Sequence, residues 1–147
     1  MNTFENLQLS APVLRAISDL GFANPTPIQA ETLPILLNKP TDFLGLAATG
    51  TGKTAAYAIP LLERVDIEKR GVQGLILCPT RELALQVSEQ VTRIGKYKGV
   101  RSVAIYGGAG YSDQIRGLKQ GANVVVGTPG RIIDHLKKGT LKLSSLS

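Results

Sequence analysis

From residue 43 onward, short apolar runs alternate with segments that have the spacing of amphipathic helices. The runs occupy residues 43–47, 74–78, 100–106 and 124–127, and the helix candidates that follow them occupy residues 55–64, 81–94, 113–119 and 131–138. Short apolar strands that alternate with helices predict a parallel β-sheet with helices on both faces, an α/β fold. Ligands of such sheets bind at the carboxyl ends of the strands.

The first forty residues have a helical pattern instead. Ser10 is a candidate N-cap for a helix that carries Val13 and Ile17 and ends at Gly21. A second helix is expected to start near residues 25–27, with a bend at Pro34. We therefore expect one domain, with a helical region over residues 1–40 and an α/β core over residues 41–147.

Composition narrows the class of protein. With 147 residues, 43% of them hydrophobic and 19% charged, the chain suits a globular domain with a real core. No stretch approaches the roughly 20 apolar residues that span a membrane, and the N-terminus lacks the pattern of a secretory signal. A single cysteine, Cys78, excludes an intramolecular disulfide and fits a reducing compartment, so we expect a cytoplasmic protein.

The chain is basic, with a formal net charge of +6 and a pI of about 9.7. A basic surface favours polyanions such as nucleic acid. Because the lysines and arginines are spread along the chain, charge alone favours the alternative that they form solvated helix faces.

Residues 47–54 fit the pattern of a phosphate-binding loop, with alanine in the first position. They read Ala47, Ala48, Thr49, Gly50, Thr51, Gly52, Lys53 and Thr54. Glycines allow a tight turn whose N–H groups face phosphate oxygens, and the following helix presents its positive N-terminus. A lysine here reaches the β- and γ-phosphates, and a threonine hydroxyl holds Mg²⁺. The motif predicts a nucleotide and Mg²⁺ site.

An enzyme of this type also needs an acid at the end of a neighbouring strand, which positions the metal and the attacking water. None of the apolar runs ends in Asp or Glu: Asp42 precedes its run, and Glu82 and Asp134 fall within helix candidates. The chain is therefore expected to bind a nucleotide without hydrolysing it.

Further motifs resemble those of the DEAD-box RNA helicases. Residues 21–29 (GFANPTPIQ) resemble the family's Q motif, and Phe4 stands seventeen residues before Gly21, where the family has an isolated aromatic residue. Residues 47–54 resemble motif I, and residues 79–84 (PTRELA) with Gln86 resemble motif Ia. Gly107 and Gly108 resemble the GG element, and residues 128–131 (TPGR) resemble motif Ib. These motifs occur in the family's order across essentially the whole chain.

The resemblance implies an ATP-dependent RNA helicase whose first RecA-like, P-loop domain is incomplete at the C-terminus of this chain. The family's Asp-Glu-Ala-Asp motif and second RecA-like domain do not occur within the 147 residues. A truncated domain would explain the missing strand-end acid.

The resemblance also assigns residues to ATP. Gln29 would face the adenine edge and Phe22 would stack on the ring, while Lys53 and Thr54 would be catalytic, with Thr54 on the metal. The complete set implied for the nucleotide is Phe4, Phe22, Pro27, Gln29, Ala48, Thr49, Gly50, Thr51, Gly52, Lys53, Thr54 and Ala55. Without the motif, Gln29 would be read as a surface polar residue of a helix and Phe22 as a core residue.

A second set is assigned to the RNA backbone, bound without regard to base sequence. It comprises Pro79, Thr80, Arg81, Gly107, Gly108, Thr128, Pro129, Gly130 and Arg131. Glycine lets main-chain N–H groups reach phosphates, arginine adds charge, and Thr-Pro-Gly opens a helix whose N-terminus attracts an anion. The alternatives are that the prolines and glycines only make turns, and that Arg81 pairs with Glu82 or Glu89.

Two other functions remain open at this point: a small P-loop kinase, and a nucleotide-dependent interaction module without catalysis. A kinase would need an arginine-rich lid and an acceptor site, which residues 107–147 do not suggest. His135 is expected to be an exposed helix residue, because no second His or Cys lies at metal-binding spacing.

Overall fold

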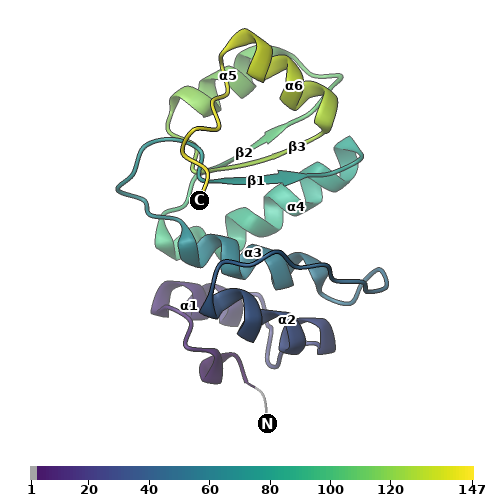
Figure 1. Ribbon diagram of the computed structural model, residues 1–147, viewed down its shortest axis with the longest axis vertical. Coiled ribbons are helices and arrows are strands. Elements are labelled where there is room, and N and C mark those ends of the chain that lie inside the picture. The colour runs from purple at the N-terminus through teal and green to yellow at the C-terminus, as the bar shows by residue number, and fades with distance from the viewer. Residues whose placement is uncertain (1–2) are drawn as a thin grey trace. The chain divides into compact units, whose positions relative to one another are not determined.

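The computed structural model describes residues 3–147, which form two compact units (Figure 1). The first contains the described residues up to Arg64 together with Arg93–Lys98. The second contains Val65–Thr92 and Gly99–Ser147. The subdivision expected at residue 40 falls inside the first unit.

The first unit is helical. It contains a 3-10 turn η1 (Phe4–Leu7), the helices α1 (Ala11–Asp19), α2 (Pro27–Asn38) and α3 (Lys53–Arg64), and a second 3-10 turn η2 (Lys96–Lys98). Leu33 of α2 and Ile59 and Leu62 of α3 are completely buried. Burial of such apolar side chains is the main source of stability for helices of this length.

Helix α1 begins and ends where the sequence predicts, although its start is held differently. The Ser10 hydroxyl does not cap the helix; it donates a hydrogen bond of 2.8 Å to Oε1 of Glu63, on α3. Gly21 adopts φ = +76°, a left-handed conformation that glycine reaches without steric cost, and the chain leaves the helix there. The Ser10–Glu63 contact therefore ties α1 to α3.

The strand predicted over residues 43–47 is wrong. These residues have no regular secondary structure, and the side chains of Leu44 and Leu46 are 86% and 87% exposed. A strand gains its stability from hydrogen bonds to a neighbouring strand. Within the described part of the chain, no segment pairs with residues 43–47. The apolar run is thus suited to a strand but has no partner.

The second unit contains a parallel sheet, as predicted. The described residues form three strands, β1 (Gly74–Leu77), β2 (Ser102–Ile105) and β3 (Val124–Gly127), in the order β1-β3-β2. Gly74 and Ser102 both pair with Val124, and Leu77 and Ile105 both pair with Gly127. The strand β3 lies between the other two, and all four of its residues are buried.

Helices cover both faces of this sheet, which confirms the α/β class. Helix α4 (Arg81–Ile94) lies on one face, and α5 (Tyr111–Lys119) and α6 (Pro129–Lys138) lie on the other (Figure 1). On the α4 face, the Ser102 hydroxyl lies 3.0 Å from that of Thr92. The core on the opposite face consists of Val72, Ile105, Val125, Ile132 and Leu141.

None of the helices within residues 3–147 is long and apolar enough to cross a bilayer. The longest helix of the described residues, α4, runs for 14 residues and has charged side chains along it. The helices instead bury single apolar faces against a core.

Gly127 at the end of β3 provides a test of this packing. A Cβ atom added there would lie 2.7 Å from the backbone oxygen of Ile105 and 2.6 Å from Cδ1 of Ile132. We expect Gly127→Ala to lower the free energy of unfolding by about 1–3 kcal/mol, because a backbone atom must shift. Chemical denaturation measures this change.

Gly107→Ala is the matched control, because a Cβ at Gly107 meets no atom within 4 Å. We expect this control to change the free energy of unfolding by less than about 0.5 kcal/mol. Equal effects of the two substitutions would contradict the close packing at Gly127.

Candidate functional site

The candidate phosphate loop lies in the first unit, immediately before α3. Gly50 and Gly52 have φ values of +77° and +87°, which favour glycine, and the hydroxyl of Thr51 closes the turn by donating 2.6 Å to the carbonyl of Ala48. Lys53 is the first residue of α3 and is exposed. The loop therefore ends at a helix N-terminus, where backbone N–H groups attract an anion.

Gln29 connects the segment before α2 to this loop. Its side chain is 3% exposed, its Oε1 accepts a hydrogen bond of 3.0 Å from the backbone N–H of Thr26, and its Nε2 donates one of 3.1 Å to the carbonyl of Gly52. A Cβ added at Gly52 would lie 2.5 Å from that Nε2. The loop thus needs glycine here for the close approach of Gln29, and the alternative of a surface glutamine is wrong.

The Gln29 amide still has hydrogen-bonding capacity after these contacts. A side-chain amide has two N–H donors and two acceptor lone pairs, and the contacts with Thr26 and Gly52 use one of each. One donor and one acceptor remain on the same planar group. An adenine edge, with its N6 amino group and N7 acceptor, has the complementary pattern.

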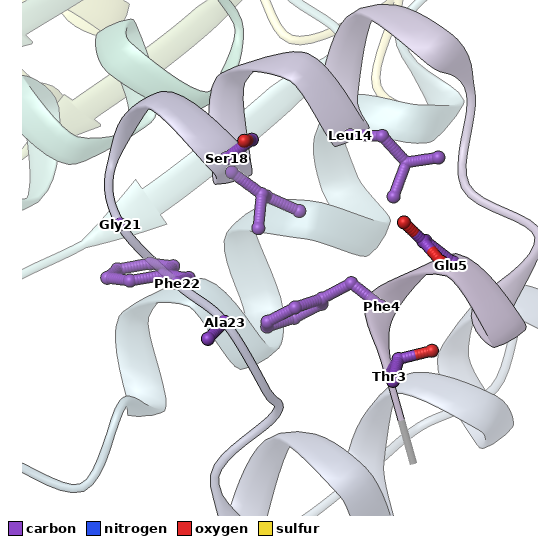
Figure 2. A pocket seen from close by; sticks show the side chains of 9 residues that line it. Thr3, Phe4, Glu5, Leu14, Ser18, Gly21, Phe22 and Ala23 are labelled. Carbon is purple, nitrogen blue, oxygen red and sulfur yellow. The ribbon is translucent and has the colours of Figure 1, made fainter. Parts of the chain in front are cut away.

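The two aromatic residues predicted to bind the nucleotide lie at one cavity. Phe4 and Phe22 line a cavity of about 440 Å³ together with Leu14, Ile17 and Ala23. Figure 2 shows the Phe4 ring pointing toward Ala23 and Phe22. Phe4 is buried and Phe22 half-buried. The residues that line this cavity include neither Gln29 nor the phosphate loop. Pro27 stands at the start of α2.

Carboxylates do not gather at the loop. Among residues 3–147, no group of three or more His, Cys, Asp or Glu side chains is placed to hold a metal ion. Asp42 is exposed in the irregular segment before the loop. Thr54 in the first turn of α3 is therefore the residue that the motif itself offers to Mg²⁺.

The residues predicted to bind RNA lie in the second unit. Pro79, Thr80 and Arg81 follow β1, Gly107 and Gly108 follow β2, and residues 128–131 follow β3. Because the strands are parallel, the structure brings these segments to one edge of the sheet, where their carboxyl ends lie.

Two helices begin at this edge. Thr80 precedes α4, and its hydroxyl accepts a hydrogen bond of 3.2 Å from the backbone N–H of Leu83. Thr128 precedes α6, with Pro129 and Gly130 in the first turn. Thr80, Pro129 and Gly130 are exposed, so both helix starts face solvent.

Arg81 joins two of the segments. Its guanidinium carbon lies 4.8 Å from the centre of the Tyr106 ring, and a Cβ added at Gly108 would lie 3.7 Å from its Nη1. An arginine over an aromatic face is held by cation–π attraction. Arg81 therefore lies over the residues that follow β2, rather than only at the start of α4.

Arg131 is engaged within the protein. Its Nη1 donates to the carbonyl of Ala109 at 2.9 Å and to Oε1 of Gln114 at 3.3 Å, and its guanidinium carbon lies 4.0 Å from the centre of the Tyr111 ring. These contacts fix the residues after Gly107 and Gly108 to α5 and α6. Since a guanidinium has five N–H donors, some remain for a phosphate.

His135 is completely buried, so the expectation of an exposed residue is wrong. One ring nitrogen lies 2.8 Å from Oε1 of Gln114 and the other 2.7 Å from the Thr140 hydroxyl. Gln114 in turn donates from Nε2 to the carbonyl of Tyr106 at 3.0 Å. Sequence reasoning missed this network, and its only local sign was the helical spacing of His135 from Arg131 and Ile132.

The surroundings lower the pKa of His135. Burial is the largest cause, and the positive charges of Arg131 and Lys138 act in the same direction, whereas Asp134 opposes them. The neutral ring is therefore the form that the network contains. With Gln114 oriented by its bond to Tyr106, the His135 Nε2–H donates to Oε1. The Thr140 hydroxyl lies 2.7 Å from Nδ1 and 3.2 Å from the His135 carbonyl oxygen, so its one proton serves these two acceptors.

This shift predicts an acid sensitivity. Because the folded pKa lies below the unfolded value of about 6.5, the unfolded chain takes up the proton first, and stability falls as the pH drops below that value. We expect His135→Gln to remove part of this loss between pH 7.5 and pH 5.5. Denaturation curves of both proteins across this range check it; identical pH profiles would contradict a neutral buried ring.

Comparisons with known proteins place this geometry in context. The model of the DEAD/DEAH box helicase family matches residues 26–147. The ATP-dependent RNA helicase DeaD of Escherichia coli is 56% identical over 146 residues, which are 99% of this chain and 23% of that protein. The DEAD-box ATP-dependent RNA helicase CshA of Geobacillus kaustophilus is 53% identical over 143 residues, 97% of this chain and 30% of its own length.

Solved structures agree with the fold. A DEAD box protein from Methanococcus jannaschii superposes with a TM-score of 0.93 at 45% identity, over 100% of this chain and 40% of the other. Dbp5 of Saccharomyces cerevisiae, bound to RNA and ADP BeF3, gives a TM-score of 0.89 at 33% identity, over 100% of this chain and 37% of the other. The chain thus spans about a quarter of the curated relatives that it matches.

Proposed function

Because the chain belongs to the DEAD/DEAH box helicase family, we propose that it forms the ATP-binding and RNA-backbone-binding part of an ATP-dependent RNA helicase. The relatives named ATP-dependent RNA helicases support the activity of the whole protein. The local geometry supports two roles for this chain: binding an adenine nucleotide with Mg²⁺, and binding an RNA strand through its phosphates.

The observation that carries the nucleotide role is the hydrogen bond from Gln29 to the carbonyl of Gly52. Through it, the side chain that would read the base is fixed directly to the loop that would hold the phosphates. The spare donor and acceptor of Gln29 suit adenine, whereas guanine presents a carbonyl oxygen in place of the adenine amino group. Phe4 and Phe22 are the proposed aromatic contacts.

The proposed phosphate site consists of the loop and the first turn of α3, from Ala48 to Ala55. Gly50 and Gly52 expose the backbone N–H groups, Lys53 would meet the β- and γ-phosphates, and Thr54 would hold Mg²⁺. The cradle at Gly52, where a Cβ would collide with Gln29, fits this use. Bound Mg²⁺ would supply charge neutralisation between phosphates.

The proposed RNA site is the edge where the strands of the second unit end. Thr80, Gly108 and Gly130 offer hydroxyl and main-chain donors, and Arg81 and Arg131 offer charge. These groups recognise phosphates and sugars instead of base edges, so binding would not depend on base sequence. Arg131 would also hold the Gly107–Gly108 turn in place through Ala109.

A cytoplasmic location is also part of the proposal. Cys78, directly after β1, is 3% exposed, and burial raises the pKa of its thiol. A buried, protonated thiol packs as a small apolar group and reacts poorly. This use of the single cysteine suits a reducing compartment.

The nucleotide role is tested by base selectivity. We expect the chain to bind ADP more tightly than GDP, and Gln29→Ala to weaken ADP binding by about 1–2 kcal/mol, because a polar partner of the base is lost. Titration calorimetry with both nucleotides measures this.

Gln86→Ala is the matched control, because Gln86 is an exposed glutamine of α4. It should leave ADP affinity unchanged. Equal affinity for ADP and GDP in the unmodified chain would refute the role of Gln29.

We also expect this chain by itself to release no phosphate from ATP, even with saturating RNA and Mg²⁺. Its sequence has no carboxylate at the end of an apolar run, and no second RecA-like domain lies within it to place arginines on the developing charge. Such arginines contribute on the order of 10³–10⁵ in rate in other phosphoryl-transfer enzymes. The measurement is RNA-stimulated phosphate release.

Lys53→Ala serves as the control for contaminating enzymes. Turnover that is present in the chain and absent from the Lys53 variant would overturn the expectation. It would also require a metal-binding acid among Asp42, Glu82, Asp113 and Asp134.

A further inference from the structure

A basic cavity lies in the second unit, away from the proposed RNA edge. It has a volume of about 610 Å³, and its lining comes from the segments that lead into the strands, around residues 69–71, 99–101 and 118–123. The motif residues follow the same strands. Because the strands are parallel, the cavity and the proposed RNA edge lie at opposite ends of the sheet, about 13 Å apart for strands of four residues.

The charged residues that line this cavity are all cations. Lys69, Arg70, Arg101 and Lys119 contribute to it, and no Asp or Glu does. In a hollow lined by charges of one sign, the field is focused and oppositely charged ligands are concentrated. The cavity is therefore suited to an anion.

Most of these charges are uncompensated. Among residues 3–147, no ion pair involves Lys69, Arg70 or Lys119, and these side chains are exposed. Asp66, three residues before Lys69, instead accepts a hydrogen bond from the backbone N–H of Glu68. The cations are free to meet a ligand.

One of the cations is already oriented. Nη1 of Arg101 donates a hydrogen bond of 2.6 Å to the carbonyl of Gln120, and the backbone N–H of Arg101 donates to Oδ1 of the buried Asn123 at 2.9 Å. These bonds fix the segment before β2 to the segment before β3. The cavity thus has a rigid wall, which lowers the entropic cost of binding.

The lining also shows which anion fits. Gly71, Gly99 and Gly121 have φ values of +101°, +81° and +95°, so the turns at the cavity carry no side chains that would fill it. No aromatic residue lines it, so there is no surface on which a base could stack. Arginine forks match the paired oxygens of phosphate.

We propose that this basic cavity binds phosphate groups of an RNA backbone, as a second RNA contact on the end of the sheet opposite the first. The assignment to RNA rests on the proposed function. Its cations come from three separate segments and surround a space within the roughly 300–1,000 Å³ range of ligand pockets, so more than one phosphate group fits. An RNA strand that contacts both ends of the sheet would run along the outside of this unit.

The test compares two double variants that remove the same charge. Arg70→Ala with Lys119→Ala alters the cavity, and Lys137→Ala with Lys142→Ala removes two exposed cations that do not line it. Binding of a fluorescently labelled single-stranded RNA is measured over a series of salt concentrations. Thermal melting checks that both variants remain folded.

Each phosphate contact on a single strand contributes about 0.7 to the slope of log affinity against log salt concentration. The cavity variant loses two such contacts, so its slope should become shallower by about 1.4. The control variant should leave the slope nearly unchanged. Equal slopes for the two variants would overturn the proposal, because the cavity would then act only through net charge.

A variant at the first edge separates this proposal from the proposed function. If Arg81→Ala leaves RNA binding intact while the cavity variant weakens it, the first RNA edge fails and the cavity stands. If only Arg81→Ala weakens RNA binding, the cavity proposal is overturned and the proposed function stands.

Inorganic pyrophosphate distinguishes RNA from a free phosphate compound. Amide NMR signals of Gly71, Gly99 and Gly121 are followed with RNA and with pyrophosphate at equal phosphate concentration. If the shifts saturate at a lower concentration of RNA than of pyrophosphate, the cavity is an RNA site. If they saturate at a lower concentration of pyrophosphate, the RNA proposal is overturned and the cavity is a site for a small polyphosphate.

Discussion

The hydrogen bonds of Gln29 are the constraint on which the candidate nucleotide site depends. The same amide accepts from the backbone at Thr26 and donates to the carbonyl of Gly52, so the start of α2 and the phosphate loop are held together. The group is buried, and leaving a buried polar partner unpaired costs about 1–3 kcal/mol. The contact also explains why glycine is required at position 52, where a side chain would occupy the position of Gln29.

The second unit uses a comparable buried polar centre for a different purpose. Gln114 contacts His135, Arg131 and the carbonyl of Tyr106, and so connects α5, α6 and the end of β2. Two of the segments proposed to meet RNA are positioned by these bonds. Burial and the neighbouring cations lower the pKa of His135, which keeps the ring neutral and the network intact near neutral pH. The proposed RNA edge therefore has fixed backbone donors.

Most strands and helices could be predicted from local sequence patterns, because each of them has its own periodic spacing of apolar residues. The strands β1 and β3 and the helix α4 lie where the sequence predicts them. Residues 43–47 differ because a strand depends on a partner distant in sequence. His135 was misjudged because its burial depends on Gln114, 21 residues away. Phe4 and Phe22 could be paired only by resemblance, since nothing local brings them to one cavity.

A crystal structure of the chain with ADP and Mg²⁺ tests the central claim most directly, because it shows the base and the phosphates at once. The account predicts that the adenine amino group and N7 lie within hydrogen-bonding distance of the Gln29 amide. The phosphates should lie against the backbone N–H groups of residues 50–54, with the bond from Gln29 to Gly52 retained. Phosphates in the loop with an adenine that does not contact Gln29 would contradict it.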